Sequence, residues 1–279
     1  HEFSSWEEML KSADRPLTEA MESTGRKRSS RRSGLSKWTK WTLTSTWEEA
    51  LHLARTGWYE KTKEVAHKKR ALVNRVSKQV PKSAIGHAIS NGFHFDIGRV
   101  VTGDPKHWMV FEEDDTRDGR GEKLRKITFN AGYSWKTDAE VIVTKGIMIA
   151  SLIELLEYAG YAVDFTISIA FTRYNQLYQF LAPVKTYGQP ILLSRLLFAT
   201  AHPAMLRRIA FAVCESELDR WWLDKIGIGR GYGHVSPLER KYHGDLYIDS
   251  GAITKESLTS AGQEKWLINQ LKRQGVRLI

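Results

Sequence analysis

The feature that most constrains the fold is a run of three apolar segments across residues 124–171. The first, LRKITFNA at 124–131, is a short β-like run. The last, YAVDFTISIAF at 161–171, alternates in polarity and is rich in β-branched residues, which is typical of a strand. The segment between them, TDAEVIVTKGIMIASLIELLEYAG at 137–160, predicts a long apolar helix. This order predicts a βαβ unit with parallel strands in a sheet buried on both faces.

Cap residues predict the ends of that helix. Thr137 with Glu140 three residues later matches the reciprocal capping box, and Gly160 suits the left-handed residue that ends many helices. Next, QLYQFLAPVKTYG predicts a strand that returns antiparallel to the second one. The helical stretch after Pro190 is interrupted at Pro203, where proline cannot donate to the preceding turn, so we expect two helices or a kink.

The remaining segments complete an α/β order. GDLYID predicts a further strand, AGQEKWLINQLKRQG a helix, and VRLI a last short strand. Over residues 124–279 this order, with an antiparallel hairpin at one edge, resembles the von Willebrand factor A-like branch of the Rossmannoid folds. The late strand that ends in Asp249, followed by a helix and a Gly-Val-x-hydrophobic strand, is similar too. The resemblance implies an α/β domain with a mostly parallel sheet.

The resemblance also implies a Mg²⁺ site at the carboxyl end of the first strand. In that family an Asp-x-Ser-x-Ser motif, a Thr from a later loop and an Asp after the fourth strand hold a divalent cation. At the three motif positions this chain has Asn130, Gly132 and Ser134. Thr200 and Asp249 are the candidates for the other two ligands.

Two of the three motif positions depart from the pattern. An amide at Asn130 removes a negative charge and Gly132 removes an oxygen, whereas Mg²⁺ requires charged or strongly polar oxygens. These departures favour a site that has lost its ion and serves as a turn. Because loops and helix N-termini meet at this edge of such sheets, we expect Tyr133, Trp135 and Lys136 to bind a protein partner or stack a base there.

Residues 1–83 predict a basic helical arm ahead of this domain. SSWEEML and STWEEAL each match a capping box, so each predicts a helix start. Residues 1–80 contain 17 Lys or Arg and 10 Asp or Glu, a net charge of +7. Between the two helices GRKRSSRRSG, at residues 25–34, has no apolar residue, so we expect it to be disordered until it binds a partner.

Two basic segments indicate contacts with nucleic acid, because each Lys or Arg that neutralises a phosphate releases counterions. The alternative is a solvated tail and an ordinary surface helix with a charged outer side. The predicted nucleic-acid-binding residues are Arg26, Lys27, Arg28, Arg31 and Arg32 in the first segment, and Lys68, Lys69 and Arg70 in an amphipathic helix across residues 61–80.

Several other features narrow the function. The single cysteine, Cys214, has no partner for a disulfide and lies in an apolar helix, which favours a buried thiol and an intracellular protein. There is no run of about 18 apolar residues, so we expect no membrane span.

Residues 84–123 predict an irregular β/loop connector packed on the core, and its acidic cluster at 112–115 favours an exposed turn. GIGRGYG predicts a mobile loop, with Arg230 as a candidate phosphate contact.

A second similarity covers most of the chain. STWEEALHLARTGW, FDIGRVVTGDP and RKITFNAGYS resemble segments of uncharacterised proteins encoded by bacterial viruses. That similarity implies a viral origin, in the host cytoplasm or the virion, and no activity.

Three function hypotheses follow. The first is a non-catalytic interaction module that binds a protein partner, with the basic arm on nucleic acid or an acidic surface, and the degenerate ligand set favours it. The second is a dedicated DNA- or RNA-binding protein. The third is a metal-dependent enzyme acting at the strand end.

Overall fold

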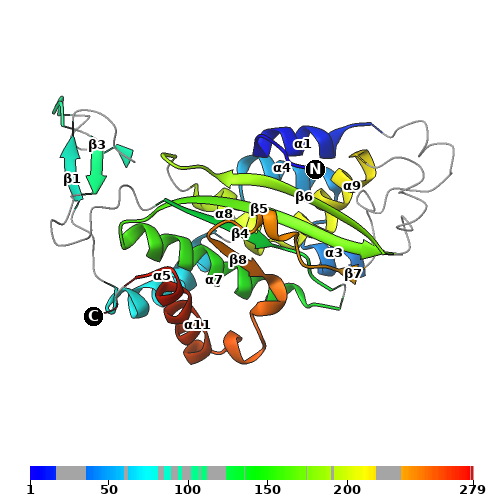
Figure 1. The fold of residues 1–279 in the computed structure, drawn as a ribbon. Helices are drawn as coiled ribbons and strands as arrows, with labels where there is room; N and C mark the ends of the chain where they lie inside the picture. The colour runs from blue at the N-terminus through cyan, green and yellow to red at the C-terminus, as the bar shows by residue number, and fades with distance from the viewer. Residues whose placement is uncertain are drawn as a thin grey trace.

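A computed structural model of the chain describes residues 1–16, 36–59, 62–80, 85–88, 94–95, 102–106, 108–111, 124–134, 136–173, 175–189, 192–217, 234–276 and 278. The helices in Figure 1 are α1 (Trp6–Asp14), α3 (Ser36–Thr42), α4 (Trp47–Thr56), α5 (Thr62–Ser77), α7 (Ala139–Tyr158), α8 (Leu193–Ala201), α9 (Phe211–Glu217) and α11 (Ser260–Arg273). The strands are β1 (Ile85–Ala88), β2 (His94–Phe95), β3 (Trp108–Phe111), β4 (Leu124–Asn130), β5 (Ala162–Arg173), β6 (Gln176–Lys185), β7 (His234–Val235) and β8 (Leu246–Asp249).

The main sheet has the strand order β6-β5-β4-β8, and the short β7 pairs with β5 off this path. β4 is parallel to both β5 and β8, which confirms the predicted βαβ unit. β5 and β6 form the predicted antiparallel hairpin. Asn175, at the turn, has a φ of +60°, a conformation that Asn tolerates better than most residues. The chain is therefore α/β with a mixed sheet.

The first residues of the chain lie along the outer edge of β6. Phe3 N–H donates to the Leu181 carbonyl at 3.0 Å, and Leu181 N–H donates to the carbonyl of His1 at 3.0 Å. Glu2 and Leu181 form a parallel bridge. This pairing covers the unpaired backbone groups of an edge strand. It joins segments about 180 residues apart and was not predicted from the sequence.

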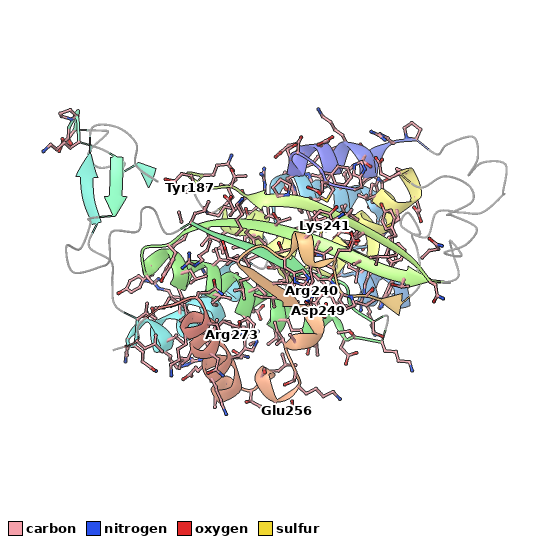
Figure 2. All side chains as sticks on the ribbon, in the orientation of Figure 1. Tyr187, Arg240, Lys241, Asp249, Glu256 and Arg273 are labelled. Atoms are coloured by element: carbon pink, nitrogen blue, oxygen red, sulfur yellow. The ribbon has the colours of Figure 1, made fainter. Side chains whose placement is uncertain are left out.

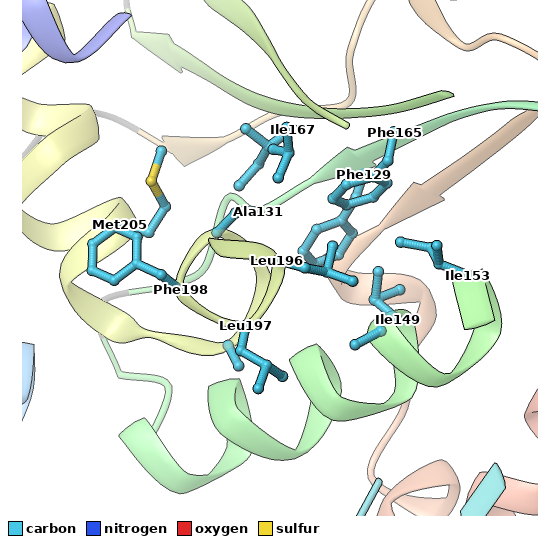
Figure 3. Close-up of a cluster of buried hydrophobic side chains, with 14 of the residues drawn as sticks. Phe129, Ala131, Ile149, Ile153, Phe165, Ile167, Leu196, Leu197, Phe198 and Met205 are labelled. Atoms are coloured by element: carbon cyan, nitrogen blue, oxygen red, sulfur yellow. The ribbon is translucent and has the colours of Figure 1, made fainter. Parts of the chain in front are cut away.

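The two faces of the main sheet have different coverings. Alternate residues of β4 point to opposite faces. Ile127 and Phe129 face α7 and α8, and Figure 3 shows Phe129 with Ile149 of α7 and Leu196 of α8 in the buried core. The opposite face carries Thr128 and Asn130, and residues 236–245 cross it. The sheet is thus buried on both faces at β4, as predicted. Helices cover the face that carries Phe129, and residues 236–245 cover the face that carries Asn130.

The N-terminal helices belong to the same hydrophobic core as the sheet. Trp6 and Met9 of α1, and Trp47 and Leu51 of α4, are buried in it. The Trp6 indole N–H donates to the Ala54 carbonyl at 2.9 Å. Residues 1–16 and 36–59 therefore pack as part of the body.

Both predicted capping boxes are present. Ser5 Oγ accepts from Glu8 N–H at 3.0 Å, and Thr46 Oγ1 accepts from Glu49 N–H at 3.1 Å. Each Glu carboxylate accepts in return from the backbone of the residue before the cap, Ser4 N–H in the case of Glu8. The side chains of Ser5 and Thr46 thus accept from backbone N–H groups that have no partner within the helix.

The predicted start of α7 was wrong by one residue. The N-cap is Asp138, not Thr137, and the Asp138 side chain makes no capping hydrogen bond. The carbonyl of Thr137 instead accepts from the buried guanidinium of Arg207. The end of the helix agrees with the prediction, since Gly160 has a φ of +84° just after it.

The predicted break at Pro203 is confirmed. α8 ends at Ala201, a π-helix follows over Met205–Ala210, and the segments Leu193–Ala201 and Met205–Glu217 are bent by 69°. In the described part of the chain no single helix is long and apolar enough to cross a membrane. Among the described residues, only the two segments of this bent pair, taken together, have the length and apolar composition of a span. Cys214, in α9, is buried as predicted, and burial raises the pKa of its thiol.

A second, smaller sheet forms within the predicted connector, with the order β1-β3-β2 and both pairings antiparallel. In Figure 1 it stands beside the larger body, at the left. The acidic cluster at 112–115 lies outside the described residues. So do residues 227–233, which include the Gly-rich loop and Arg230.

Candidate functional site

Beyond the carboxyl end of β4, the short strand β7 takes the place of β4 beside β5. β4 pairs with β5 as far as Asn130 and Ser168, and Ala131 N–H still donates to the Ser168 carbonyl at 2.9 Å. Further along β5, Val235 of β7 pairs antiparallel with Phe171, and Ser236 N–H donates to the Ala170 carbonyl at 3.0 Å. The chain leaves the sheet after β4 and β7 enters in its place.

Gly132 provides the space for this arrangement. A Cβ at residue 132 would lie 2.7 Å from Val235 Cγ1 and 3.2 Å from Asn130 Oδ1. The residue that replaces the first Ser of the family motif thus permits close packing of β7 against the turn. The predicted role of Gly132, to allow an unusual turn, fits this placement.

Asn130 is fully buried and uses both ends of its amide inside the protein. Its Nδ2 donates to the Ser236 carbonyl at 2.9 Å and to Asp249 Oδ2 at 3.0 Å, and Tyr247 Oη lies 3.3 Å away. Its Oδ1 accepts from Gly132 N–H at 3.2 Å. Because the Ser236 carbonyl can only accept and the Gly132 N–H can only donate, these two groups determine the orientation of the Asn130 amide.

Asp249 is the direct register partner of Asn130 across β4 and β8. Its Oδ2 also accepts from Tyr247 Oη at 3.0 Å, and its Oδ1 accepts from Gly251 N–H at 2.8 Å. Both carboxylate oxygens are therefore bonded to donors of the protein. We call Asn130, Tyr247 and Asp249 the strand-end cluster; Figure 2 labels Asp249 at the end of its strand.

Residues 236–245 cover the strand-end cluster. Leu238 N–H donates to Tyr247 Oη at 3.0 Å, and the His243 ring stacks on the Tyr247 ring with centroids 3.9 Å apart. The Tyr242 carbonyl accepts from Thr128 Oγ1 at 2.9 Å. Burial is the main reason that the pKa of Tyr247 is raised.

The predicted Mg²⁺ ligands are not brought together as a set. Asn130 and Asp249 meet, but through an amide nitrogen that donates to the carboxylate. Ser134 is exposed and its Oγ accepts from Lys136 N–H at 3.3 Å. Across the described residues no group of three or more His, Cys, Asp or Glu side chains is placed to hold a metal ion. The donor set present does not fit the cation that the resemblance implies.

Thr200 lies on the other side of the sheet. It belongs to α8, where its Oγ1 bonds to the carbonyls of Leu196 at 2.8 Å and Gly146 at 3.3 Å within the α7–α8 contact. The helices cover the face that carries Phe129, whereas Asn130 points to the opposite face. Strand alternation therefore separates Thr200 from the cluster, which sequence position could not reveal.

The predicted partner-binding edge is only partly at the surface. Tyr133 is buried, and its Oη has no hydrogen-bond partner among the described residues. Burial and then the charge of Asp249 raise the pKa of Tyr133. Lys136 is exposed, as expected, while Trp135 lies outside the described residues. Tyr133 therefore cannot present its ring to a partner.

Lys145 of α7, which sequence analysis did not single out, reaches the same end of the sheet. Its Nζ donates to the Ser250 carbonyl at 2.6 Å and lies 5.7 Å from the centroid of the Tyr133 ring. Burial lowers the pKa of Lys145, and the charge of Asp249 opposes that shift. No sequence motif marks Lys145 or Tyr247. The register of β8 brings Tyr247 to Asn130, and the packing of α7 brings Lys145 to the Ser250 carbonyl.

The predicted nucleic-acid-binding residues fall into three groups. Arg26, Lys27, Arg28, Arg31 and Arg32 lie outside the described residues. Lys68 and Arg70 are exposed on α5, and Lys68 pairs with Glu64 at 2.8 Å. Lys69 is buried and pairs with Glu154 of α7, so it contributes to packing and is not available to a phosphate.

Comparison with known proteins gives one match. A family described as "Domain of unknown function (DUF7192)" matches residues 1–277. No curated protein and no solved structure matches the sequence. The match covers the N-terminal helices, the small sheet and the main sheet together, so the chain belongs to the DUF7192 family.

Proposed function

We propose that this chain is a non-catalytic interaction module, whose body binds a protein partner and whose basic segment contacts nucleic acid or an acidic surface. The observation that carries this proposal is the bonding of Asp249. Both of its oxygens accept from the protein's own donors, Gly251 N–H on one side and Asn130 and Tyr247 on the other. The protein's own donors take three of the about four lone-pair sites of this carboxylate, and no group of three or more His, Cys, Asp or Glu side chains gathers around it in the described part of the chain, so Asp249 serves the fold.

The proposed partner surface lies around the turn after β4. Ser134 and Lys136 are exposed on that turn. Val235 is 41% exposed and lies close to Gly132 of the same turn, so the turn has an exposed apolar side chain as well as an exposed basic one. Such a mixture suits a protein partner with an apolar contact and an acidic group.

We further propose a degenerate von Willebrand A-like fold and a viral origin, in the host cytoplasm or the virion. The order β6-β5-β4-β8, with the hairpin at one edge, supports the fold proposal. The similarity of three segments, STWEEALHLARTGW, FDIGRVVTGDP and RKITFNAGYS, supports the proposed viral origin.

Residues 25–34, which we call the Arg/Ser segment, lie between described stretches that contact the body of the protein. Before the segment, Arg15 pairs with Glu217 at 2.9 Å. After it, Arg207 donates to the Trp41 carbonyl at 2.6 Å and Arg208 to the Thr44 carbonyl at 3.1 Å. Both flanks are thus held on the body. The composition of residues 25–34, with five Lys or Arg and no apolar residue, supports nucleic-acid binding as the second candidate function.

A pull-down with the full chain as bait tests the protein-binding proposal. We expect a specific host or viral protein to be captured by the parent and lost when Lys136→Glu and Val235→Asp are combined. Lys255→Glu, on an exposed residue of another segment, is the control and should keep the protein. Equal capture by all three proteins would contradict the proposed surface.

A gel shift tests the contribution of the basic segment. Arg26, Lys27, Arg28, Arg31 and Arg32 are replaced together by Gln, and binding of labelled DNA and RNA is compared at low salt. We expect weaker binding and a shallower salt dependence, because fewer counterions are released. Identical binding curves for parent and variant would remove the segment from the proposal.

A further inference from the structure

Helices α5 and α11 lie side by side in Figure 1 and are joined by polar contacts. Arg75 of α5 pairs through Nε with Glu264 of α11, and its Nη2 donates to Ser260 Oγ at 3.2 Å. Each helix also buries an apolar side in the common core, with Leu72 and Val76 on α5, and Trp266 and Leu267 on α11. The outer sides of the two helices are therefore held in place by the fold.

Most of the net charge of the protein lies on this helix pair. Residues 62–80 and 260–276 contain nine Lys or Arg and two Glu, which is a net charge of +7 out of +10 for the chain. From the sequence, a basic surface was predicted for the first segment only. The second segment lies about 190 residues further on, and the fold brings the two together.

Both acids of the pair are already used. Glu64 pairs with Lys68 and Glu264 with Arg75. Five exposed cations make no ion pair within the described residues, and we call them the basic face: Arg70, Lys78, Lys265, Lys272 and Arg273. Figure 2 labels Arg273 on α11.

We infer that the basic face binds the sugar–phosphate backbone of a nucleic acid, independently of the partner surface at the end of β4. Protein partners and membranes usually need apolar or aromatic anchors. The large apolar side chains exposed in the described residues are Tyr59, Tyr158, Leu177, Tyr187, Leu192 and Val235, and none lies on α5 or α11. Cations without such anchors suit a partner that is recognised by its charge.

The spacing of the cations fits a phosphate backbone. Arg70 lies on α5 and Lys78 lies in the turn directly after Ser77, where the helix ends. Eight residues at the helical rise correspond to about 12 Å. That length matches three to four base pairs at about 3.4 Å each along one strand. Exposed amides of Asn74 and Asn269 lie among the cations and can donate to phosphate oxygens. Five phosphate contacts on duplex DNA imply a slope near −4.5 for the logarithm of affinity against that of salt, at about −0.9 per contact.

Fluorescence anisotropy with a short labelled DNA duplex of random sequence tests the inference. The variant replaces Lys265, Lys272 and Arg273 with Gln. The control replaces Lys106, Arg240 and Lys255 with Gln; these cations are exposed elsewhere, and the net charge change is the same. We expect the first variant to lose at least tenfold in affinity at low salt and the control to stay within about twofold of the parent. The slope should fall by about 2.7, or 0.9 for each of three lost contacts.

Three results would overturn the inference. In the first, the parent does not bind the duplex at low salt. In the second, the control loses as much affinity for the duplex as the variant, so that net charge and not the basic face determines binding. In the third, vesicles containing phosphatidylserine bind the parent and not the variant, while the duplex binds both proteins equally. Urea unfolding of each protein shows that the exposed substitutions leave the fold intact. The variant of the Arg/Ser segment, measured beside them, separates failure of that proposal from failure of this one.

Discussion

The strand-end cluster and the basic face differ in what their polar groups do. Asn130 and Asp249 lie where the resemblance predicts a cation, yet their side chains bond to each other and to the backbone. On α5 and α11, by contrast, the five cations of the basic face are exposed and make no ion pair within the described residues. The match of a residue to a family motif thus predicts where it lies in the fold. The hydrogen bonds of its side chain indicate whether it can still bind a ligand.

The largest effect should come from Asn130→Asp. The change removes the amide that donates to Ser236 and places a second buried carboxylate beside Asp249. An uncompensated buried charge costs about 3–5 kcal/mol of unfolding free energy. Urea unfolding at neutral pH measures the loss. If the variant is as stable as the parent, the cluster is not the closed network described above.

A double-mutant cycle at Gly132 and Val235 tests the close approach of β7. Gly132→Ala should cost about 1–3 kcal/mol, because its Cβ would overlap Val235 Cγ1. In the background of Val235→Ala the same change should cost clearly less. Additive losses in the cycle would show that the two residues do not touch.

Two tyrosines near Asp249 provide a matched pair. Tyr247→Phe removes a hydroxyl that bonds to Leu238 and Asp249, and should cost about 0.5–1.5 kcal/mol. Tyr133→Phe removes a buried hydroxyl without a partner in the described residues, so stability should stay equal or rise. Chemical unfolding of both variants checks the contrast; equal losses would contradict it.

The same tyrosines imply a loss of stability at alkaline pH. The pKa of each is raised in the folded protein. Their contribution is fully present below the pKa of an unfolded tyrosine, about 10, and is lost as pH rises above it, because the unfolded chain releases the protons first. Unfolding measured from pH 9 upward should show a smaller decline in the Tyr133→Phe and Tyr247→Phe variants. A decline of the same steepness in all three proteins would assign it to other groups.

The smallest effects distinguish two neighbouring lysines of α5. Lys69→Ala removes the buried partner of Glu154 and should cost about 1 kcal/mol. Lys68→Ala removes an exposed pair with Glu64 and should change stability by less than about 0.5 kcal/mol. Thermal unfolding compares the two, and the reverse order would contradict the placement of α5.

Local signals carried the prediction of the fold furthest. The periodicity of β4, α7 and β5 predicted the parallel pair, and the capping boxes predicted α1 and α4. β7 escaped prediction because two residues show no periodicity. The pairing of His1 and Phe3 with β6 escaped for another reason, since contacts between distant segments leave no trace in local sequence.

The candidate site was predictable in part. Asn130 and Asp249 were both placed correctly at the end of their strands, and the register makes them partners. Their mutual hydrogen bond, and the position of Thr200 beyond the opposite face, depend on which side of the sheet each residue points to. A ligand motif carried over by position does not contain that information.

The most direct test of the account is the unfolding of the parent in urea with and without Mg²⁺, at matched ionic strength. A cation that binds only the folded state adds about 2.7 kcal/mol when its concentration is about 100 times its Kd. Because three of the about four lone-pair sites of Asp249 are taken and its partner Asn130 is an uncharged amide, we predict the same midpoint with Mg²⁺, with Mn²⁺ and with neither. A rise in the midpoint that Asp249→Ala abolishes would contradict the central claim and restore the strand-end cluster as an ion site.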